Sequence, residues 1–389
     1  MKVGLVSPYD YSHPGGVTEH IRHLGKWLVQ LGHEVRTFAP SSRSDIERDL
    51  PNFYRIGRPI PIPVNNSVAR VTLSFHLADR VAEILARERF DVLHFHEPLM
   101  PALPITVLRL SPVPNVGTFH AFARSNVGYY YGRAILKHYL ERLDRMIAVS
   151  EPAREFVTQY FSNADVRVIP NGVDVDTFRP GQTPIRHLRD ESVNVLFVGR
   201  LEPRKGLREL LRGYEYMKAR VPESRLIIVG DGPRRARVES YISSHRLKDV
   251  VLAGYVPQSV LPRYYASADI FCSPATGSES FGIVLLEAMA SGLPIVATEI
   301  PGYLSVVEPG RDAVTVRPKG WPELGAALTL LARDEQLRLR MGAAGLEKAR
   351  RYSWREVTIR VIEAYQEARL AAASERESKD VHEPIPEVG

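Results

Sequence analysis

Short apolar segments alternate with amphipathic segments along the first part of the chain. The apolar run Val3–Val6 has the length and composition of a buried strand. After a loop, apolar residues recur at the spacing of one helix face, at Ile21, Leu24, Leu28 and Leu31, and Gly32 marks the end of this helix. Further strands are expected at Glu34–Ala39, Val92–Phe95, Asn115–Phe119 and Met146–Val149. This β-α-β order predicts a parallel sheet with helices on both faces.

The same alternation starts again at Val193. The strands expected in this second set are Val193–Val198, Leu226–Val229, Val250–Ala253, Asp269–Cys272, Pro294–Ala297 and Ala313–Val316. Between the two sets lies the segment Pro170–Asp174, and a polar stretch from Pro180 to Ser192 follows it. Proline and glycine interrupt regular structure there, so the domain boundary is expected in the polar stretch.

The predicted fold class is therefore α/β, with two doubly wound domains, residues 1–180 and 181–353, facing a cleft. A long helix is expected at about Trp354–Ala373, crossing back toward the first domain. The tail, residues 374–389, is mostly charged or proline-bearing. It is expected to be disordered, because it cannot bury enough apolar surface to offset its ordering entropy.

Composition narrows the class of protein. The 389 residues are 44% hydrophobic and 25% charged, which is ordinary for a soluble globular chain. The single cysteine, Cys272, excludes an internal disulfide framework and a cysteine-based zinc cluster. The net charge of +6 is spread evenly, without a basic arm, so nucleic acid is not an expected partner.

No signal peptide is recognisable and no apolar run reaches the roughly 18 residues of a membrane span. The protein is expected to be cytoplasmic, at most peripheral on the inner face of the cell membrane.

The first candidate for chemistry is the loop that leaves the first strand and ends in Gly15-Gly16. Ligands of doubly wound folds bind beyond the carboxyl ends of strands, and a helix N-terminus offers free backbone N–H groups. This position therefore suits an anion. The alternative is that the two glycines only close a tight turn. The loop lacks the spacing G-x-G-x-x-G, which argues against a nicotinamide cofactor.

The second candidate is a pair of basic residues, Arg200 and Lys205, directly after the first strand of the second domain. Both could meet a diphosphate from one side through charge-assisted hydrogen bonds. A single basic loop residue is usually solvated. Two at this topological position favour a functional role.

The third candidate is an acidic pair, Glu279 and Glu287, in a loop that runs into a helix from about Gly282 to Ser291. Glu287 is expected to line the cleft, where its carboxylate can accept hydrogen bonds from both ribose hydroxyls. Backbone N–H groups at the helix start suit a phosphate; these belong to Phe281, Gly282, Ile283 and Val284. The spacing alone does not distinguish the pair from a solvated helix face, but its glycine-rich, strand-bounded context does.

Together these features resemble the retaining, nucleotide-sugar-dependent glycosyltransferases of the GT-B fold, glycosyltransferase family four, whose two Rossmann-like domains face a cleft. The resemblance covers nearly the whole chain, and it is greatest to the bacterial phosphatidyl-myo-inositol α-mannosyltransferases. The segments that carry this closer resemblance are Val3–Val17, Pro59–Arg70, Phe90–Pro98, Thr118–His120 and Ile169–Asp174.

The resemblance implies a role for each matched residue. The implied catalytic residues are His120, Glu279, Arg200 and Lys205. The implied donor-binding residues are Gly16, Arg200, Lys205, Val256, Glu279, Phe281, Gly282, Ile283, Val284 and Glu287. The implied acceptor-binding residues are Tyr9, Asp10, Arg70 and His120, with Arg70 a candidate for a lipid phosphate. By the same resemblance, the acceptor hydroxyl attacks from the face that the diphosphate leaves. A double displacement would instead need a carboxylate close behind C1.

Three functions stay open. The first is transfer of mannose from GDP-mannose to phosphatidyl-myo-inositol or a similar lipid. The loop Gly254–Leu261 lacks the acidic and lysine side chains expected beside guanine, and the helix near His76–Arg89 is not strongly basic. A second possibility is therefore a UDP-sugar donor with a soluble inositol phosphate or saccharide as acceptor. The third is a non-catalytic nucleotide-sugar-binding protein, which the joint presence of two basic and two acidic site residues disfavours.

Two further segments need an interpretation. Tyr129–Leu143 combines aromatic residues with basic ones such as Arg133 and Lys137, which suits an anionic membrane surface, although an ordinary packed helix is the alternative. His94, His96 and Glu97 could suggest a metal site, but no further ligand stands out nearby. No metal or other cofactor is expected, and the oligomeric state is left open.

Overall fold

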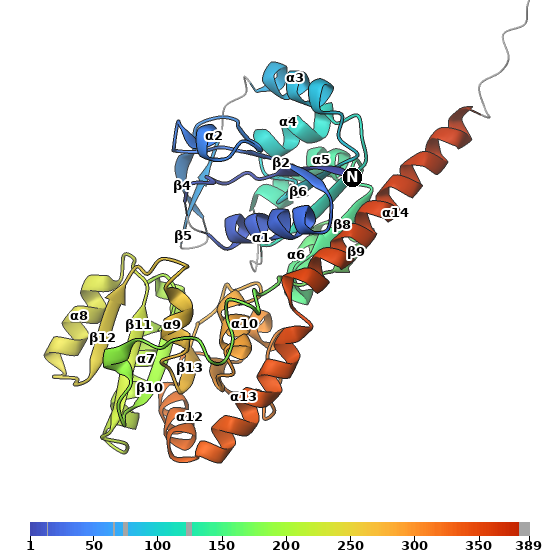
Figure 1. The fold of residues 1–389 in the computed structure, drawn as a ribbon. Coiled ribbons are helices and arrows are strands. Elements are labelled where there is room, and N and C mark those ends of the chain that lie inside the picture. Colours follow the sequence, from blue (N-terminus) through green and yellow to red (C-terminus); the bar gives the residue numbers. More distant parts are fainter. Residues whose placement is uncertain (14, 65–66, 73–76, 122–126, 381–389) are drawn as a thin grey trace, which may run out of the picture. The chain divides into compact units, whose positions relative to one another are not determined.

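The computed structural model describes residues 1–13, 15–64, 67–72, 77–121 and 127–380 (Figure 1). The chain forms two compact units. The first comprises Met1–Val64, Val68–Pro170 and the chain from Val357 onward, and the second is essentially Asn171–Glu356. The change of unit at Asn171 lies earlier than the expected division after Pro180.

The first unit is built on a seven-stranded parallel sheet with strand order β3-β2-β1-β6-β7-β8-β9. Its strands are β1 (Lys2–Val6), β2 (Glu34–Ala39), β3 (Phe53–Arg55), β6 (Val92–His96), β7 (Asn115–Phe119), β8 (Arg145–Ala148) and β9 (Val166–Val168). A separate pair is formed by β4 (Ile60–Val64) and β5 (Ser67–Val71). Its helices are α1 (Gly16–Gln30), α2 (Ile46–Asp49), α3 (Ala78–Glu88), α4 (Leu103–Leu110), α5 (Val127–Leu140), α6 (Glu151–Tyr160) and the part of α14 (Trp354–Asp380) that follows Glu356.

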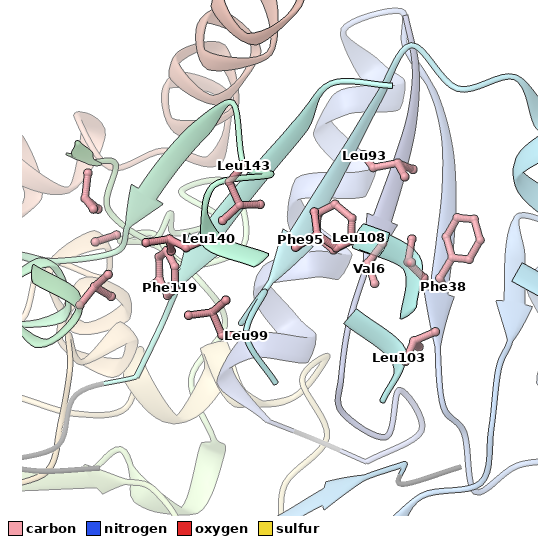
Figure 2. Packing of buried hydrophobic residues seen from close by; sticks show 14 of the residues in the cluster. Val6, Phe38, Leu93, Phe95, Leu99, Leu103, Leu108, Phe119, Leu140 and Leu143 are labelled. Atoms are coloured by element: carbon pink, nitrogen blue, oxygen red, sulfur yellow. The ribbon is translucent and has the colours of Figure 1, made fainter. Parts of the chain in front are cut away.

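Helices cover both faces of this sheet because successive strand side chains point to opposite faces. Val6 and Phe38 belong to the core that α3, α4, α5 and α6 complete (Figure 2). Leu5 points to the other face, where its side chain lies 3.5 Å from the position a Cβ would take on Gly25 of α1. Helix α14 joins this face through the hydroxyl of Tyr365, 2.7 Å from Nδ1 of His94 on β6.

The second unit repeats the plan with a six-stranded parallel sheet of order β12-β11-β10-β13-β14-β15. Its strands are β10 (Val193–Val198), β11 (Ser224–Val229), β12 (Val250–Gly254), β13 (Ile270–Ser273), β14 (Ile295–Thr298) and β15 (Ala313–Val316). Its helices are η1 (Arg186–Leu188), η2 (Pro203–Lys205), α7 (Leu207–Lys218), α8 (Arg235–Ser244), α9 (Leu261–Tyr265), α10 (Ile283–Ala290), α11 (Pro301–Leu304), α12 (Trp321–Arg333) and α13 (Glu335–Arg350). Two cores lie on the two faces: one contains residues of α9 and α10, the other residues of α7 and α12.

The expected α/β class with two doubly wound sheets is confirmed, and every expected strand is present to within two residues at either end. The strands β3, β4, β5 and β9 were not predicted from the sequence.

Helix α14 differs from expectation because it continues to Asp380 instead of ending at Ala373. Residues 374–380 read Ser-Glu-Arg-Glu-Ser-Lys-Asp, and the glutamate, arginine and lysine residues in this segment have a high helix propensity. The rest of the tail, 381–389, lies outside the described residues. Among the residues that are described, no helix has both the length and the apolar character needed to cross a bilayer.

Candidate active site

The first unit brings the residues expected at the acceptor to one edge of its sheet. Tyr9, which follows β1, forms an antiparallel bridge with Val71, and the backbone N–H of Asp10 donates to the carbonyl of Arg70 at 2.9 Å. The Asp10 carboxylate is buried and accepts backbone N–H groups of Ser12 and Ser42 at 3.1 and 3.0 Å. The expected acceptor residues Tyr9, Asp10 and Arg70 are therefore neighbours: Asp10 holds the loop after β1 that carries it and Tyr9, and Arg70 lies on β5.

Helix α1 begins beside this edge. Gly15 is extended, with φ of −171°, and a Cβ placed on Gly16 would meet no atom within 4 Å. The first backbone N–H groups of a helix have no partner inside the helix, so an approach to Gly16 is open to an anion. One turn later, the ring of His20 lies 4.8 Å from the ring of His120. The structure thus places the expected diphosphate contact one helical turn from the expected sugar contact.

His120, directly after β7, is held from two sides by residues at the end of β6. Oε1 of Glu97 accepts the backbone N–H groups of His120 and Ala121, both at 2.7 Å. Nδ1 of His96 lies 3.0 Å from Nε2 of His120. His96 and Glu97 are 0% and 4% exposed, and His120 is 7% exposed. These contacts fix both the backbone and the ring of His120.

Burial shifts the protonation of this group of residues. It raises the pKa of Glu97 to about 7, although the two N–H groups that the carboxylate accepts oppose the shift. Burial also raises the pKa of Tyr9, and the nearby Glu97 charge adds to that effect. For His96 and His120, burial and neighbouring histidines hold the pKa well below the usual range.

All three histidine rings of this group, His20 included, place a nitrogen within 4.8 Å of the others, a grouping that could hold a metal ion. From the sequence, only His94, His96 and Glu97 were considered as possible metal ligands.

The second unit gathers the charged residues expected at the donor. Nζ of Lys205 lies 2.7 Å from Oε1 of Glu279, and Nη1 of Arg204 donates to the same oxygen. Glu202, whose side chain is 2% exposed, pairs with Nη1 of Arg200 and Nε of Arg204, both at 3.1 Å. Two carboxylates therefore hold three cations at the carboxyl end of β10, which is the position expected for a diphosphate.

The loop that carries Glu279 is packed tightly before α10. A Cβ on Gly302 would lie 2.0 Å from the backbone oxygen of Glu279, so only glycine allows this approach. Gly282 caps α10 with φ of +104°, and Phe281 is buried. Helix α10 then begins at Ile283 and runs through Val284, close to the expected start. These positions hold the helix N-terminus next to Glu279.

Glu287 lies within α10 and is 8% exposed. The hydroxyl of Tyr265 on α9 donates to its Oε2 at 2.7 Å, which gives the buried carboxylate a polar partner. Burial and the Glu287 charge together raise the pKa of Tyr265, so the tyrosine stays a donor. Val256, expected beside the base, follows β12 and packs on the same core as α10.

Sequence reasoning missed several residues that these contacts bring in, namely His20, Glu202, Arg204 and Tyr265. One of them carried a usable signal. His20 precedes Leu24 and Leu28 at intervals of four, so it lies on the buried face of the predicted helix. Arg204 carried none, because its role depends on Glu279, 75 residues away in the chain.

Two regions of the chain match known families of glycosyltransferases. Residues 14–177 match the family described as Glycosyltransferase Family 4, and residues 182–348 match Glycosyl transferases group 1. The phosphatidyl-myo-inositol mannosyltransferase of Mycolicibacterium smegmatis is 35% identical over 94% of this chain and 94% of its own length. A D-inositol 3-phosphate glycosyltransferase of Kribbella flavida is 28% identical over 93% of this chain and 92% of its own.

The fold agrees with these matches. The crystal structure of Anabaena Alr3699/HepE in complex with UDP superposes with a TM-score of 0.76, covering 94% of this chain and all of the other at 19% identity. At that identity the likeness establishes the fold alone. From the near full-length sequence matches and this fold, the chain belongs to the family of GT-B glycosyltransferases that includes the bacterial phosphatidyl-myo-inositol mannosyltransferases.

Proposed function

We propose that the protein is a retaining hexosyltransferase that moves mannose from GDP-mannose to phosphatidyl-myo-inositol. The observation that carries the proposal is the 35% identity, over nearly the whole of both chains, to enzymes named phosphatidyl-myo-inositol mannosyltransferase. The charged group at the carboxyl end of β10 supports it, because a nucleoside diphosphate leaving group needs such cations.

The proposal assigns the donor mainly to the second unit. Arg200 and Lys205 neutralise the diphosphate, together with backbone N–H groups at the start of α10. Glu287 accepts the ribose hydroxyls, Glu279 contacts the sugar ring, and Val256 borders the base. The positive charge comes from side chains and helix N-termini, so the proposed transfer includes no metal ion.

The proposed reaction keeps the anomeric configuration. The bond between C1 and the diphosphate oxygen breaks, and the acceptor hydroxyl oxygen forms its bond to C1 from the same face. The hydroxyl proton passes to the departing diphosphate. His120 contacts the transferred sugar, while Tyr9, Asp10 and Arg70 face the acceptor. A double displacement remains the competing route, and it requires a carboxylate behind C1.

A second candidate is a UDP-sugar donor with a soluble inositol phosphate or saccharide as acceptor. The similarity to an enzyme named D-inositol 3-phosphate glycosyltransferase favours it. The loop after β12 reads Tyr-Val-Pro-Gln-Ser and offers no acidic or lysine side chain for guanine.

Donor selectivity separates the two candidates. We expect GDP and GDP-mannose to raise the melting temperature more than UDP, UDP-glucose or UDP-N-acetylglucosamine at equal concentration. A ligand at about 100 times its Kd adds roughly 2.7 kcal/mol of stability, a shift that calorimetry resolves. Selectivity for uridine nucleotides would contradict the GDP-mannose assignment and support the second candidate. The Arg200→Ala variant serves as the control. Because Arg200 is proposed to bind the diphosphate, nucleotides should raise the melting temperature of this variant much less than that of the wild type.

We also propose that the exposed side of α5 docks the enzyme on an anionic bilayer that contains its acceptor. Part of the segment expected to do this is core: Tyr129 and Leu140 are buried, and Leu136 and Tyr139 pack against them. Tyr130, Tyr131 and Ile135 are instead 70%, 82% and 69% exposed. Lys137 is exposed beside them. Aromatic and apolar side chains with adjacent cations are typical of interfacial helices.

Replacing Tyr130, Tyr131 and Ile135 together by serine is expected to lower binding to vesicles containing phosphatidylinositol by at least about tenfold, since three exposed apolar groups no longer enter the bilayer. Cosedimentation measures this. Leu370→Ser is the matched control, because Leu370 on α14 is 71% exposed but has no place in the proposed surface. Equal binding of the wild type to neutral and anionic vesicles at low salt would contradict the docking surface.

A further inference from the structure

His96 and His120 share a hydrogen bond, and its direction determines which nitrogen of His120 carries the proton. His96 ends β6 and pairs in register with Thr118 of β7, two residues before His120. Nδ1 of His96 lies 3.0 Å from Nε2 of His120, within hydrogen-bond range. A bond between two neutral imidazoles needs an N–H on one ring and a lone pair on the other.

Both rings are neutral in this environment. Burial and the neighbouring histidines hold the pKa of His96 and that of His120 well below the ordinary value. Among the described residues, the titratable groups around the pair are His20 on α1, His94 on β6, and Glu97 directly after β6. Each of the two rings therefore carries one N–H, and the hydrogen bond has one of two directions.

The second nitrogen of His96 selects the direction. Nε2 of His96 is buried and has no hydrogen-bond partner among the residues that the structure describes. With the proton on Nε2, His96 would bury an unpaired N–H, which is rare in folded proteins. With the proton on Nδ1, the N–H donates to His120 and only a lone pair stays without a partner.

We propose that His96 is a positioning residue whose Nδ1–H donates to Nε2 of His120 and so fixes His120 as its Nδ1–H tautomer. Glu97 accepts the backbone N–H groups of His120 and Ala121, and His96 holds the ring of His120. The Nδ1–H of His120 is then the ring donor for a sugar hydroxyl. The consequence for sugar transfer rests on the proposed function, whereas the tautomer itself does not.

Nitrogen NMR of protein with ¹⁵N-labelled histidine tests the tautomer directly. We expect both His96 and His120 to show a protonated Nδ1 and an unprotonated Nε2, with the Nδ1–H of His96 as the donor in the bond between the two rings. His120→Asn identifies the His120 signals by their loss. A proton on Nε2 of His120 in the wild type would overturn the proposal.

Two variants test the positioning role. In His96→Asn the amide nitrogen takes about the place of Nδ1 and keeps a donor, whereas His96→Leu removes it. We expect His96→Leu to lose the single tautomer of His120 and to lower kcat roughly 10- to 100-fold, with nucleoside diphosphate affinity unchanged. The His96→Asn variant should keep most of the single His120 tautomer and most of kcat. His245→Leu, at an exposed histidine of the second unit, is the control for labelling and folding.

The outcomes distinguish this inference from the proposed function. Unchanged kcat in His96→Leu, with the tautomer lost, would overturn the positioning role. A wild type that shows the expected tautomer but transfers no sugar would contradict the proposed function and leave the hydrogen bond standing. Added Zn²⁺ that shifts the signals of His20, His96 and His120 together and removes the proton from Nδ1 of His96 would favour the metal grouping and overturn the proposal.

Discussion

Lys205→Ala is expected to lower sugar transfer by about 10²- to 10³-fold in kcat. Nζ of Lys205 lies 2.7 Å from Glu279, and the lysine is only 12% exposed, so its charge acts where water screens it little. In the proposed reaction, negative charge grows on the departing diphosphate, and this cation stabilises the transition state more than the ground state. Glu279 keeps Arg204 as a partner in the variant, so the loop should stay folded.

Steady-state transfer of radiolabelled sugar to lipid measures the effect. Lys218→Ala is the matched control, because it removes the same charge from the same unit. Lys218 pairs with Asp249 and contacts the carbonyl of Ser224, at the start of β11 and thus at the opposite end of the sheet. Equal turnover in wild type and Lys205→Ala would contradict the role assigned to this lysine. A wild type that binds nucleotide without any turnover would support the non-catalytic alternative.

The two sheets could be predicted because their strands are short apolar runs between helical patterns, and such runs need no knowledge of distant contacts. The central strand β10, Val193–Val198, is apolar at all but one position and is found where it was expected. The missed strands lack this signal. β4 reads Ile-Pro-Ile-Pro-Val, and its prolines disfavour a strand inside a sheet, yet they are accepted in an isolated pair.

The expected site residues are brought together within each unit, but their partners could not be predicted. Arg200, Lys205 and Glu279 stood out because glycines and strands flank them. That Glu202 would be buried between Arg200 and Arg204 depends on how two loops pack, which no local pattern encodes. The same holds for His96, whose significance arises only because β6 and β7 are neighbours in the sheet.

The packing of those two loops depends on one glycine, and its replacement is expected to have a large effect on stability. Gly206 follows Lys205 with φ of +69°, and a Cβ there would lie 1.8 Å from the backbone oxygen of Pro274. The loop that Pro274 begins continues to Glu279, and Thr276 N–H donates to the Arg204 carbonyl at 2.8 Å, so this close approach also brings Lys205 to Glu279.

Gly206→Ala is therefore expected to lower the free energy of unfolding of the second unit by roughly 3 kcal/mol or more. The left-handed backbone accounts for about 1–2 kcal/mol of this, and the clash with a carbonyl that cannot move freely accounts for the rest. Urea unfolding measures the loss, and Gly310→Ala separates the two contributions. Gly310 has a similar φ of +79°, but its Cβ would meet nothing within 4 Å, so only the backbone contribution should appear.

Equal losses in the two variants would mean that the contact with Pro274 relaxes and does not hold the loops together. If the close approach does hold Lys205 in place, Gly206→Ala should also reduce transfer at temperatures where it is still folded, whereas Gly310→Ala should not.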